Sequence, residues 1–389
     1  MQPPNLRLLK PSTGPLLAIL AMAGTGLGCD STEPQPAPRI VWESAGEGWG
    51  IPAFDENQVF FLGRNHDLIA VNKTTGARTW RSVMGAGSSV TYGINVVTAG
   101  SLVIAGDAGI HAFEKSTGVA AWKYFGPAGK NPGAFDIATD GSRVYAGSTN
   151  GSVTALDATT GGELWTTDIA GTTSALVIPT LASTGLFACL RRTTTGRTTG
   201  GIVALDPATG AVRWTFEFPQ KLPAEQGGCY LHVVVAGDLV IGATFDGFIY
   251  AVDAQTGAER WSVAQITGTP TDYGSPQFDL RPLAVSGDVV AAGSTTGFIV
   301  ALRLTDGSEK WRATANRGAV VDHMTADQTG IYAFHAGRIA AFDASDGNRR
   351  FMVGDPTPTT EPLFVYAPAV DTDLLFIGGF AGLYALRKA

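Results

Sequence analysis

Short apolar runs separated by polar turns recur along most of this chain. In Leu102–Gly106 and Val289–Gly293, for example, β-branched residues and alanines lead to a glycine. A second apolar run follows, then a turn of the type Asp-x-x-Thr-Gly, and a tryptophan stands four residues beyond the glycine of that turn. Runs of this length, bounded by turn residues, predict β-strands rather than helices.

The whole unit is repeated. Seven copies begin 40 to 50 residues apart, at Ala70, Ala112, Ala155, Ala204, Ala251, Ala301 and Ala341. A period of this length is typical of four-stranded propeller blades and not of helical repeats.

The repeated turn has chemistry that suits a hairpin between the third and fourth strands of a blade. An aspartate such as Asp157 can accept hydrogen bonds from backbone N–H groups of the turn, and the glycine can adopt the left-handed conformation that a bulged hairpin needs. The aromatic residue that follows is a large apolar plate suited to docking between blades. The predicted docking residues are Trp42, Trp80, Trp122, Trp165, Trp214, Trp261, Trp311 and Phe351.

The number of blades follows from the two ends of the repeat region. After Phe351, one further set of strands runs through residues 374–379 and 382–386 and lacks a fourth strand. Residues 40–43 supply a strand of the right kind at the other end. Seven whole copies and one split copy predict an all-β, eight-bladed propeller of four-stranded antiparallel blades, closed by N- and C-terminal strands in one blade.

The repeated Ala-x-Asp-x-x-Thr-Gly-x-x-x-Trp pattern resembles the pyrroloquinoline-quinone-type propeller repeat over roughly residues 40–389. Eight blades, a lipoprotein-like leader and no other domain resemble the BamB family, the lipoproteins of the outer-membrane β-barrel assembly machinery. The resemblance implies a lipid-anchored scaffold that binds an envelope protein. In that family an interblade segment with leucine and arginine touches the barrel-assembly protein, and the most similar segment here is Phe278–Arg281.

Residues 1–28 have the composition of a targeting leader. Arg7 and Lys10 form a positive end, and residues 16–27 form an apolar stretch shorter than the about 20 residues of a membrane-spanning helix. The Gly-Cys pair that follows resembles a lipobox, which makes Cys29 the expected lipid-modified residue. Secretion with an incidental cysteine is the alternative.

The remaining chain divides into a tether and the propeller. Residues 29–39 are rich in proline and polar residues and are predicted to form an extended, solvated tether. Residues 40–389 are predicted to form the propeller. The expected location is the periplasmic side of a bacterial envelope, with the outer membrane favoured and a lipid anchor as the only membrane contact.

Composition supports a turn-rich β-protein and restricts its partners. The chain has 389 residues, 50 of them glycine, and 16% of its residues are charged. Its formal net charge is −7, and the leader's own charges are positive, so the rest of the chain is still more acidic. Nucleic acid is excluded as an expected partner because its binding requires a basic surface.

The sequence contains no recognisable catalytic, cofactor-binding or metal-binding pattern. It lacks metal-type Cys/His spacing, a Gly-x-Ser-x-Gly elbow and a phosphate-binding loop. Catalytic quinoproteins with the same repeat are expected to have an adjacent-cysteine ring, a calcium site and a much longer chain, and no Cys-Cys pair occurs here. We therefore predict a protein that is not an enzyme and holds no cofactor.

Two of the three cysteines lie within the repeats. Cys189 is predicted in the second strand of the fourth blade, and Cys229 at the beginning of the first strand of the fifth. They are placed to form a disulfide between neighbouring blades in an oxidising compartment. The alternative is two separate buried thiols, which behave as small apolar residues.

Insertions predict a binding face. Links between blades share one face with the hairpins that join second and third strands, and the long segments 191–197, 219–228 and 267–276 fall on consecutive blades. Loops on a rigid scaffold commonly carry function. Arginines there suit an acidic partner and aromatic residues suit an interface centre. The predicted interaction residues are Arg191, Arg192, Arg197, Tyr273, Phe278, Asp279, Leu280 and Arg281.

Polar residues of the innermost strands are predicted to surround the mouth of the central channel on the same face. These residues are Asn95, Asp136, Tyr230, His232, Asp322, His323 and Tyr366. They indicate a second functional hypothesis, a propeller that binds a small molecule or glycan, or a degenerate quinoprotein. A water-filled funnel with ordinary polar walls is the alternative interpretation.

Overall fold

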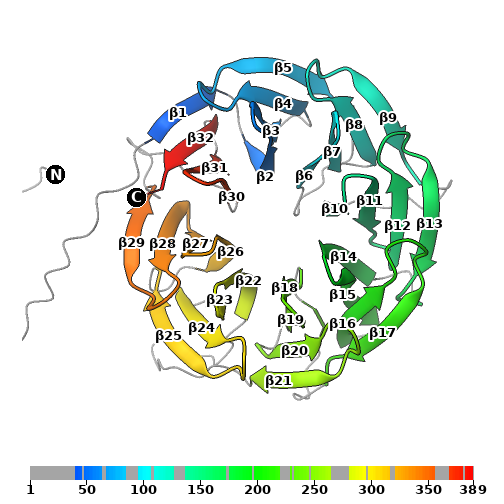
Figure 1. Cartoon of the computed structure of the whole chain (residues 1–389), viewed down its shortest axis with the longest axis vertical. Helices are drawn as coiled ribbons and strands as arrows, with labels where there is room; N and C mark the ends of the chain where they lie inside the picture. The colour runs from blue at the N-terminus through cyan, green and yellow to red at the C-terminus, as the bar shows by residue number, and fades with distance from the viewer. Residues whose placement is uncertain are drawn as a thin grey trace, which may run out of the picture. The chain divides into compact units, whose positions relative to one another are not determined.

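The sheets of this protein are arranged as blades around a central axis (Figure 1). The structure is a computed structural model that describes residues 40–45, 48–63, 67–84, 95–106, 109–126, 136–171, 175–194, 197–219, 228–229, 232–244, 247–263, 280–294, 297–315, 320–354, 368–379 and 382–388. In these ranges every regular element is a strand, and the strands form eight four-stranded antiparallel sheets.

The strands of each blade run from the innermost to the outermost. Blade 1 contains β2 (Trp49–Phe54), β3 (Gln58–Gly63), β4 (Asp67–Asn72) and β5 (Arg78–Val83). Blade 2 contains β6 (Val96–Ala99), β7 (Leu102–Gly106), β8 (Ile110–Glu114) and β9 (Ala120–Tyr124). Blade 3 contains β10 (Ile137–Thr139), β11 (Arg143–Gly147), β12 (Ser152–Asp157) and β13 (Glu163–Asp168). Blade 4 contains β14 (Ala175–Ala182), β15 (Gly185–Thr194), β16 (Arg197–Leu205) and β17 (Val212–Glu217).

The second half of the ring continues the order. Blade 5 contains β18 (Val234–Ala236), β19 (Leu239–Ala243), β20 (Ile249–Asp253) and β21 (Glu259–Val263). Blade 6 contains β22 (Leu280–Ser286), β23 (Val289–Ser294), β24 (Phe298–Arg303) and β25 (Glu309–Thr314). Blade 7 contains β26 (Val321–Ala326), β27 (Gly330–His335), β28 (Arg338–Asp343) and β29 (Arg349–Val353). Blade 8 contains β30 (Ala369–Val370), β31 (Leu374–Gly378), β32 (Gly382–Arg387) and, as its outer strand, β1 (Ile40–Ala45).

Blade 8 confirms the predicted closure by both ends of the repeat region. β1 pairs antiparallel with β32, with Ile40 opposite Leu386 and Ala45 opposite Gly382. In Figure 1 the first strand lies beside the last one. The eight-bladed, closed arrangement is therefore as predicted, and closure covers strand edges that would otherwise be open to pairing with other chains.

The apolar core lies between the blades. Middle strands such as β7 are buried along their whole length, whereas the outer strand β13 alternates between exposed and half-buried residues. Eight apolar clusters each combine side chains from two neighbouring blades. The uninterrupted apolar runs in the sequence follow from this arrangement, because a strand covered on both faces has no solvent-facing side.

The repeated turn has the predicted geometry. In blade 3 the backbone N–H groups of Thr159 and Thr160 donate to Asp157 Oδ1 at 3.0 and 2.8 Å. Gly161 follows with a φ of 71°, in the left-handed region that favours glycine. The other six repeat glycines have φ between 70° and 76°.

The tryptophans dock on the next blade in two ways. Each indole Nε1–H donates to a backbone carbonyl just after the third strand of the next blade, at 2.6 to 3.2 Å. Each ring also covers the repeat glycine there. A Cβ on Gly210, for instance, would lie 2.5 Å from a ring carbon of Trp165. The glycine is therefore required for space as well as for its φ, a second reason that the sequence pattern alone does not reveal.

Phe351 occupies the one interface where the pattern changes. The next blade is blade 8, whose third and fourth strands come from opposite ends of the repeat region and are not joined by a Thr-Gly turn. The glycine on which a tryptophan would pack is therefore missing. The smaller Phe351 packs instead in a cluster that includes Leu375, Tyr384 and Leu386.

Candidate functional site

The hairpin that joins the second and third strands of blade 4 is extended. β15 and β16 span ten and nine residues, more than any other described strand. The inner strand β14 follows them outward, with Leu176 opposite Arg191 and Ala175 opposite Arg192. The predicted insertion at 191–197 is thus a continuation of a three-stranded sheet.

Arg192 is held by its own chain. Its Nη1 donates to both carboxylate oxygens of Glu217 on β17, at 2.9 and 3.0 Å, and its Nε donates to the Ala170 carbonyl at 3.1 Å. The charge of Arg192 is therefore largely compensated within blade 4. The sequence pattern does not indicate this pairing, because Glu217 belongs to a strand 25 residues away and only the sheet order brings the two side chains together.

The remaining predicted interaction residues are placed differently. Arg197 is the first residue of β16, opposite Thr194, and Arg191 is half-buried. Leu280 and Arg281 lie in the strand β22, where Leu280 pairs with Ser294, so the expectation that Arg281 belongs to an interblade link is corrected. Pairing with β23 extends the inner strand of blade 6 further than its apolar pattern indicates. Tyr273, Phe278 and Asp279 lie outside the described residues.

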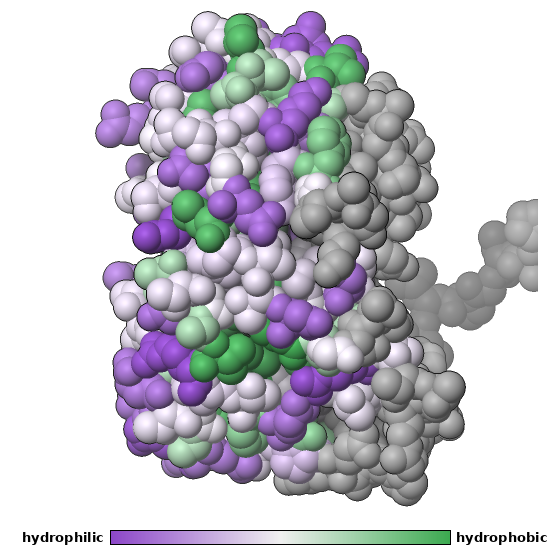
Figure 2. Space-filling view, turned by 90° about the vertical axis from the view of Figure 1, so that its right-hand side faces the viewer, coloured by the Kyte–Doolittle hydropathy of each residue, from purple (hydrophilic) through white to green (hydrophobic). Residues whose placement is uncertain are grey.

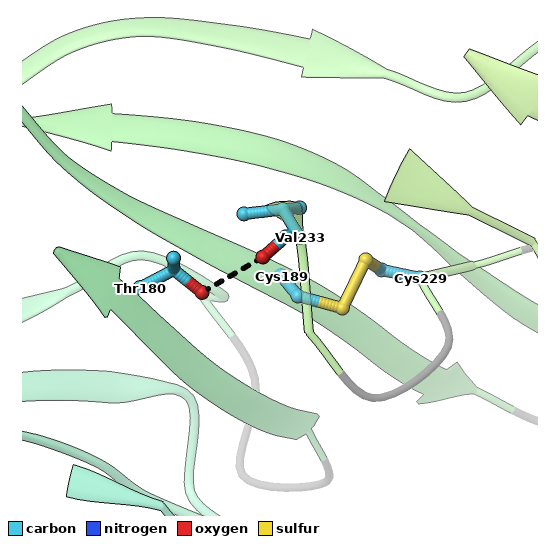
Figure 3. The surroundings of a disulfide bond; sticks show 4 residues. All are labelled: Thr180, Cys189, Cys229 and Val233. Atoms are coloured by element: carbon cyan, nitrogen blue, oxygen red, sulfur yellow. Dashed lines mark hydrogen bonds between the residues drawn. A yellow bond between two sulfur atoms is a disulfide. The ribbon is translucent and has the colours of Figure 1, made fainter. Parts of the chain in front are cut away.

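A disulfide between Cys189 and Cys229 connects blades 4 and 5 (Figure 3). Their Cα atoms are 5.4 Å apart, and both residues are buried among apolar side chains of the two blades. Of the two sequence interpretations, the bridge between neighbouring blades is the one found. Cys229 precedes β18 and forms an isolated bridge to Thr244, so it does not begin the first strand of blade 5 as expected.

Hydrogen bonds close the same interface. Cys229 donates from its backbone N–H to the Leu190 carbonyl at 3.3 Å. Thr180 on β14 donates from its hydroxyl to the Val233 carbonyl at 3.1 Å, as Figure 3 shows. The disulfide and these two bonds hold the end of the link between blades 4 and 5 against the base of the extended hairpin.

The outer rim differs from this face. Figure 2 looks at the side of the ring on which β9, β13 and β17 lie, and shows hydrophobic surface as separate patches among polar residues. Val119, Leu164 and Val212 are exposed on or beside these outer strands. They are on three different blades, and Phe125, directly after β9, is exposed as well.

Asn95, one of the predicted funnel residues, joins blades 2 and 3. Its side-chain amide donates to the Ile137 carbonyl at 2.8 Å, and its Oδ1 accepts from the Ile137 N–H at 2.9 Å. Both bonds join residues at the start of two successive inner strands. Asn95 therefore positions the backbone next to Asp136.

Burial shifts the pKa of three titratable residues of the predicted funnel. Burial raises the pKa of Asp136 to about 8. Burial lowers the pKa of His232, although its hydrogen bond with the Leu283 backbone opposes this effect. Burial and the nearby His232 lower the pKa of His323 to about 4. All three side chains are therefore predominantly uncharged at neutral pH.

The other predicted funnel residues add less. Asp322 is exposed at the bulge in β26, and His323 lies beside it with its ring 6.1 Å from that of Phe334. Tyr230 and Tyr366 lie outside the described residues. Across the ranges that the structure describes, no group of three or more His, Cys, Asp or Glu side chains is arranged to hold a metal ion. No described segment forms a helix long and apolar enough to cross a membrane.

The carboxyl group of Asp136 should make the stability of the protein depend on pH. The pKa of Asp136 is higher in the folded chain than its ordinary 3.8, so its contribution is complete below about pH 4 and is lost as pH rises towards 8. We expect Asp136→Asn to flatten this decline in thermal melts between pH 4 and 9. The pKa of His323 is lowered instead, so this residue reduces stability as pH falls from about 6.5 to 4. His323→Gln should remove that loss of stability. Equal slopes in all three proteins would contradict this.

Comparison with known proteins places the fold in a family. The chain matches the family described as outer membrane protein assembly factor BamB over residues 34–182 and 150–389. BamB from Moraxella catarrhalis has a similar structure, with a TM-score of 0.67 and 16% identity over 91% of this chain and 100% of that one.

Enzymes are among the similar proteins as well. A quinohemoprotein alcohol dehydrogenase from Pseudomonas putida HK5 has a TM-score of 0.68 and 12% identity over 90% of this chain and 76% of its own. Tetrathionate hydrolase from Acidithiobacillus ferrooxidans is 29% identical over 147 residues, which are 33% of this chain and 29% of that protein. For the two solved structures, sequence identities this low show only that the fold is shared. The match to the family covers the whole propeller, and the chain therefore belongs to the family of outer membrane protein assembly factor BamB.

Proposed function

We propose that this protein is a non-catalytic scaffold of the bacterial envelope, anchored by a lipid on Cys29, that binds a protein of the outer-membrane assembly machinery. The observation that carries the proposal is the family match, which spans the propeller from residue 34 to 389. The similar BamB structure is covered over its whole length. The quinohemoprotein dehydrogenase has about a quarter of its length outside the match.

The cysteines support binding rather than quinone chemistry. Both cysteines of the propeller form a disulfide between two blades, across a sequence separation of 40 residues. Neither is therefore part of an adjacent-cysteine ring of the kind expected in catalytic quinoproteins. We assign the protein no reaction and no cofactor.

The proposed partner site is the link-bearing face of blades 4 to 6. The extended hairpin β15–β16 offers Arg191 and Arg197, and the disulfide fixes the hairpin base to blade 5. A rigid projection loses little conformational entropy on binding. Arg192 acts through Glu217 to hold the hairpin and is not proposed as a contact. Tyr273, Phe278 and Arg281 complete the proposed surface on the next link and strand.

Capture of the partner should depend on this face. We expect Phe278→Ala combined with Arg281→Ala to reduce recovery of the barrel-assembly protein from detergent-solubilised envelope, by roughly thirtyfold in affinity if these residues form the interface centre. Arg191→Ala combined with Arg197→Ala should weaken capture in the same direction. The melting temperature, measured in parallel, should stay close to that of the unaltered protein.

Arg260→Ala provides the matched control. Arg260 lies on the outer strand of blade 5 and pairs with Asp253 at 2.5 Å, near the turn at the opposite end of the blade. Its removal should leave capture unchanged. Loss of capture in this control, or full capture by both double variants, would show that the link-bearing face is not the working surface.

Anchoring can be tested separately. We expect the unaltered protein to incorporate radioactive fatty acid and to sediment with membranes, and Cys29→Ser to lose both properties because the acyl acceptor is gone. A chain whose anchor is its acyl group should leave the membrane once it is removed. If the unaltered protein incorporates no label, then Cys29 is not acylated and is an ordinary residue near a signal-peptidase cleavage site.

The channel mouth favours a second candidate function, the binding of an uncharged small molecule or glycan. His232 and His323 come from blades 5 and 7 and interact electrostatically, and Asp136 from blade 3 is kept largely protonated at neutral pH. Neutral hydrogen-bonding groups suit hydroxyl-rich ligands. Saccharide or quinone binding by the purified protein, abolished by His232→Ala, would favour this candidate if no envelope partner is recovered.

A further inference from the structure

Blade 8 is held differently from the other blades. Its inner strand β30 has two residues, and its outer strand β1 is not joined by a turn to the neighbouring β32. Its interface with blade 7 has Phe351 in place of a tryptophan, so the indole hydrogen bond found at the other interfaces is missing there. Both the covalent and the polar connections of this blade are therefore reduced.

Ion pairs between blades occur around this blade. Lys388 Nζ lies 2.7 Å from Asp327 Oδ2 of blade 7, and Lys73 Nζ of blade 1 lies 2.7 Å from Asp371 Oδ2 of blade 8. At the next interface Lys115 Nζ lies 3.2 Å from Asp55 Oδ2. Each lysine directly follows the third strand of its blade, and each aspartate follows the inner strand of the preceding blade.

These pairs are better shielded than ordinary surface pairs. Their side chains are 17% to 24% exposed. Lys73 Nζ also lies 4.7 Å from the ring centroid of Phe54, and Lys388 Nζ lies 5.9 Å from that of Tyr332. Partial desolvation and an aromatic face strengthen a lysine's interactions beyond those of an exposed ion pair, which contributes little.

The equivalent position in the other five blades lacks a lysine. It holds Ala158, Pro207, Ala254, Leu304 and Ala344. Blade 3 shows that an aspartate alone does not make the pair, because Asp140 occupies the same turn but accepts from the Tyr145 hydroxyl at 2.9 Å. Among the described residues, the repeated lysine–aspartate arrangement is therefore confined to the interfaces 7–8, 8–1 and 1–2.

We propose that blade 8 is the part of the ring that opens first, and that Lys388–Asp327, Lys73–Asp371 and Lys115–Asp55 form an ionic latch that keeps it closed. The fold does not require the lysines, since five equivalent positions are apolar or proline. Lys388–Asp327 stands at the interface where the indole anchor is missing, and Lys73, whose carbonyl accepts from Trp42 of the closing strand β1, stands where that strand is not continuous with its neighbour. Because its contacts are ionic, the latch weakens as salt screens them.

Hydrogen exchange of the full-length protein, followed by mass spectrometry, tests the latch. Peptides from β31, β32 and β1 should exchange faster than those from β19 and β20, and raising salt from about 0.05 to about 1 M should widen the difference. Lys388→Met and Lys73→Met should each accelerate exchange in blade 8 by roughly five- to thirtyfold, with β19 and β20 unchanged. Both variants should also reduce the salt effect.

Lys310→Met is the matched control. Lys310 pairs with Asp288 at 2.7 Å within blade 6, and that aspartate is 68% exposed. Its removal should not alter exchange in blade 8. The proposal is overturned if blade 8 exchanges no faster than blade 5, if salt has no effect on the unaltered protein, or if the latch variants accelerate exchange equally in all blades. The salt comparison needs no substitution, so it holds even if a variant fails to fold.

Discussion

Deletion of residues 380–389 is expected to prevent stable folding. The segment contains β32, the strand between β31 and β1, so its loss leaves β1 without a partner and opens the ring. It also removes the buried side chains of Leu383, Tyr384 and Leu386. Each large buried side chain contributes about 2–5 kcal/mol, and the total stability of a domain is only about 5–15 kcal/mol. Thermal melting and far-UV circular dichroism measure the effect.

A shorter deletion distinguishes the effect of losing strand β32, which closes the ring, from the effect of losing the charge of Lys388. Removing residues 388–389 takes away Lys388 and its pair with Asp327 but leaves β32 whole. This variant should remain folded with a modestly lower melting temperature. If the longer deletion melts like the intact protein, then the pairing of β1 with β32 does not close the ring in solution.

Trp261→Ala is expected to lower stability by roughly 3–5 kcal/mol. Trp261 is almost fully buried between blades 5 and 6, and its Nε1–H donates to the Leu304 carbonyl at 2.8 Å. The substitution removes both the ring and the partner of that carbonyl. Trp214→Ala should cost less, because Trp214 is half-buried. Urea denaturation at constant pH measures both changes.

Two glycine substitutions test the steric part of this docking. In Gly307→Ala the new Cβ would lie 2.7 Å from a ring carbon of Trp261, at a φ of 72°. In Gly237→Ala, at a φ of 60°, the Cβ would meet no atom within 4 Å. Both bear the backbone penalty of a positive φ, so the additional loss in Gly307→Ala reports the contact with the ring. Equal losses of stability in the two variants would mean that the Trp261 ring moves aside without destabilising the protein.

Two opposite parts of the ring are held together by different interactions. Blades 4 and 5 lie across the ring from the split blade. A long link in the sequence joins them, from the end of β17 to the start of β18, and the inner strand β18 has only three residues. There the disulfide and the Thr180 hydrogen bond supply cohesion. Around blade 8, lysine–aspartate pairs take this role. The ring is therefore reinforced covalently on one side and electrostatically on the other.

The repeat by itself determined the architecture. A period of 40 to 50 residues, uninterrupted apolar runs and a turn with aspartate and glycine were sufficient to predict eight blades and their closure. These features are local or strictly periodic, so each copy supports the same interpretation as the others. The two cysteines were recognised as a candidate bridge, but their spacing left the pairing open.

Long-range side-chain contacts, both within a blade and between neighbouring blades, were decided only by the tertiary structure. The pairing of Arg192 with Glu217, the ring of Trp165 over Gly210 and the ion pair of Lys388 with Asp327 join residues that are far apart in sequence. Their geometry depends on strand register and on how one blade is rotated against the next. A linear pattern records which residues are apolar, charged or small, but the choice of partner across an interface is made only when the ring closes.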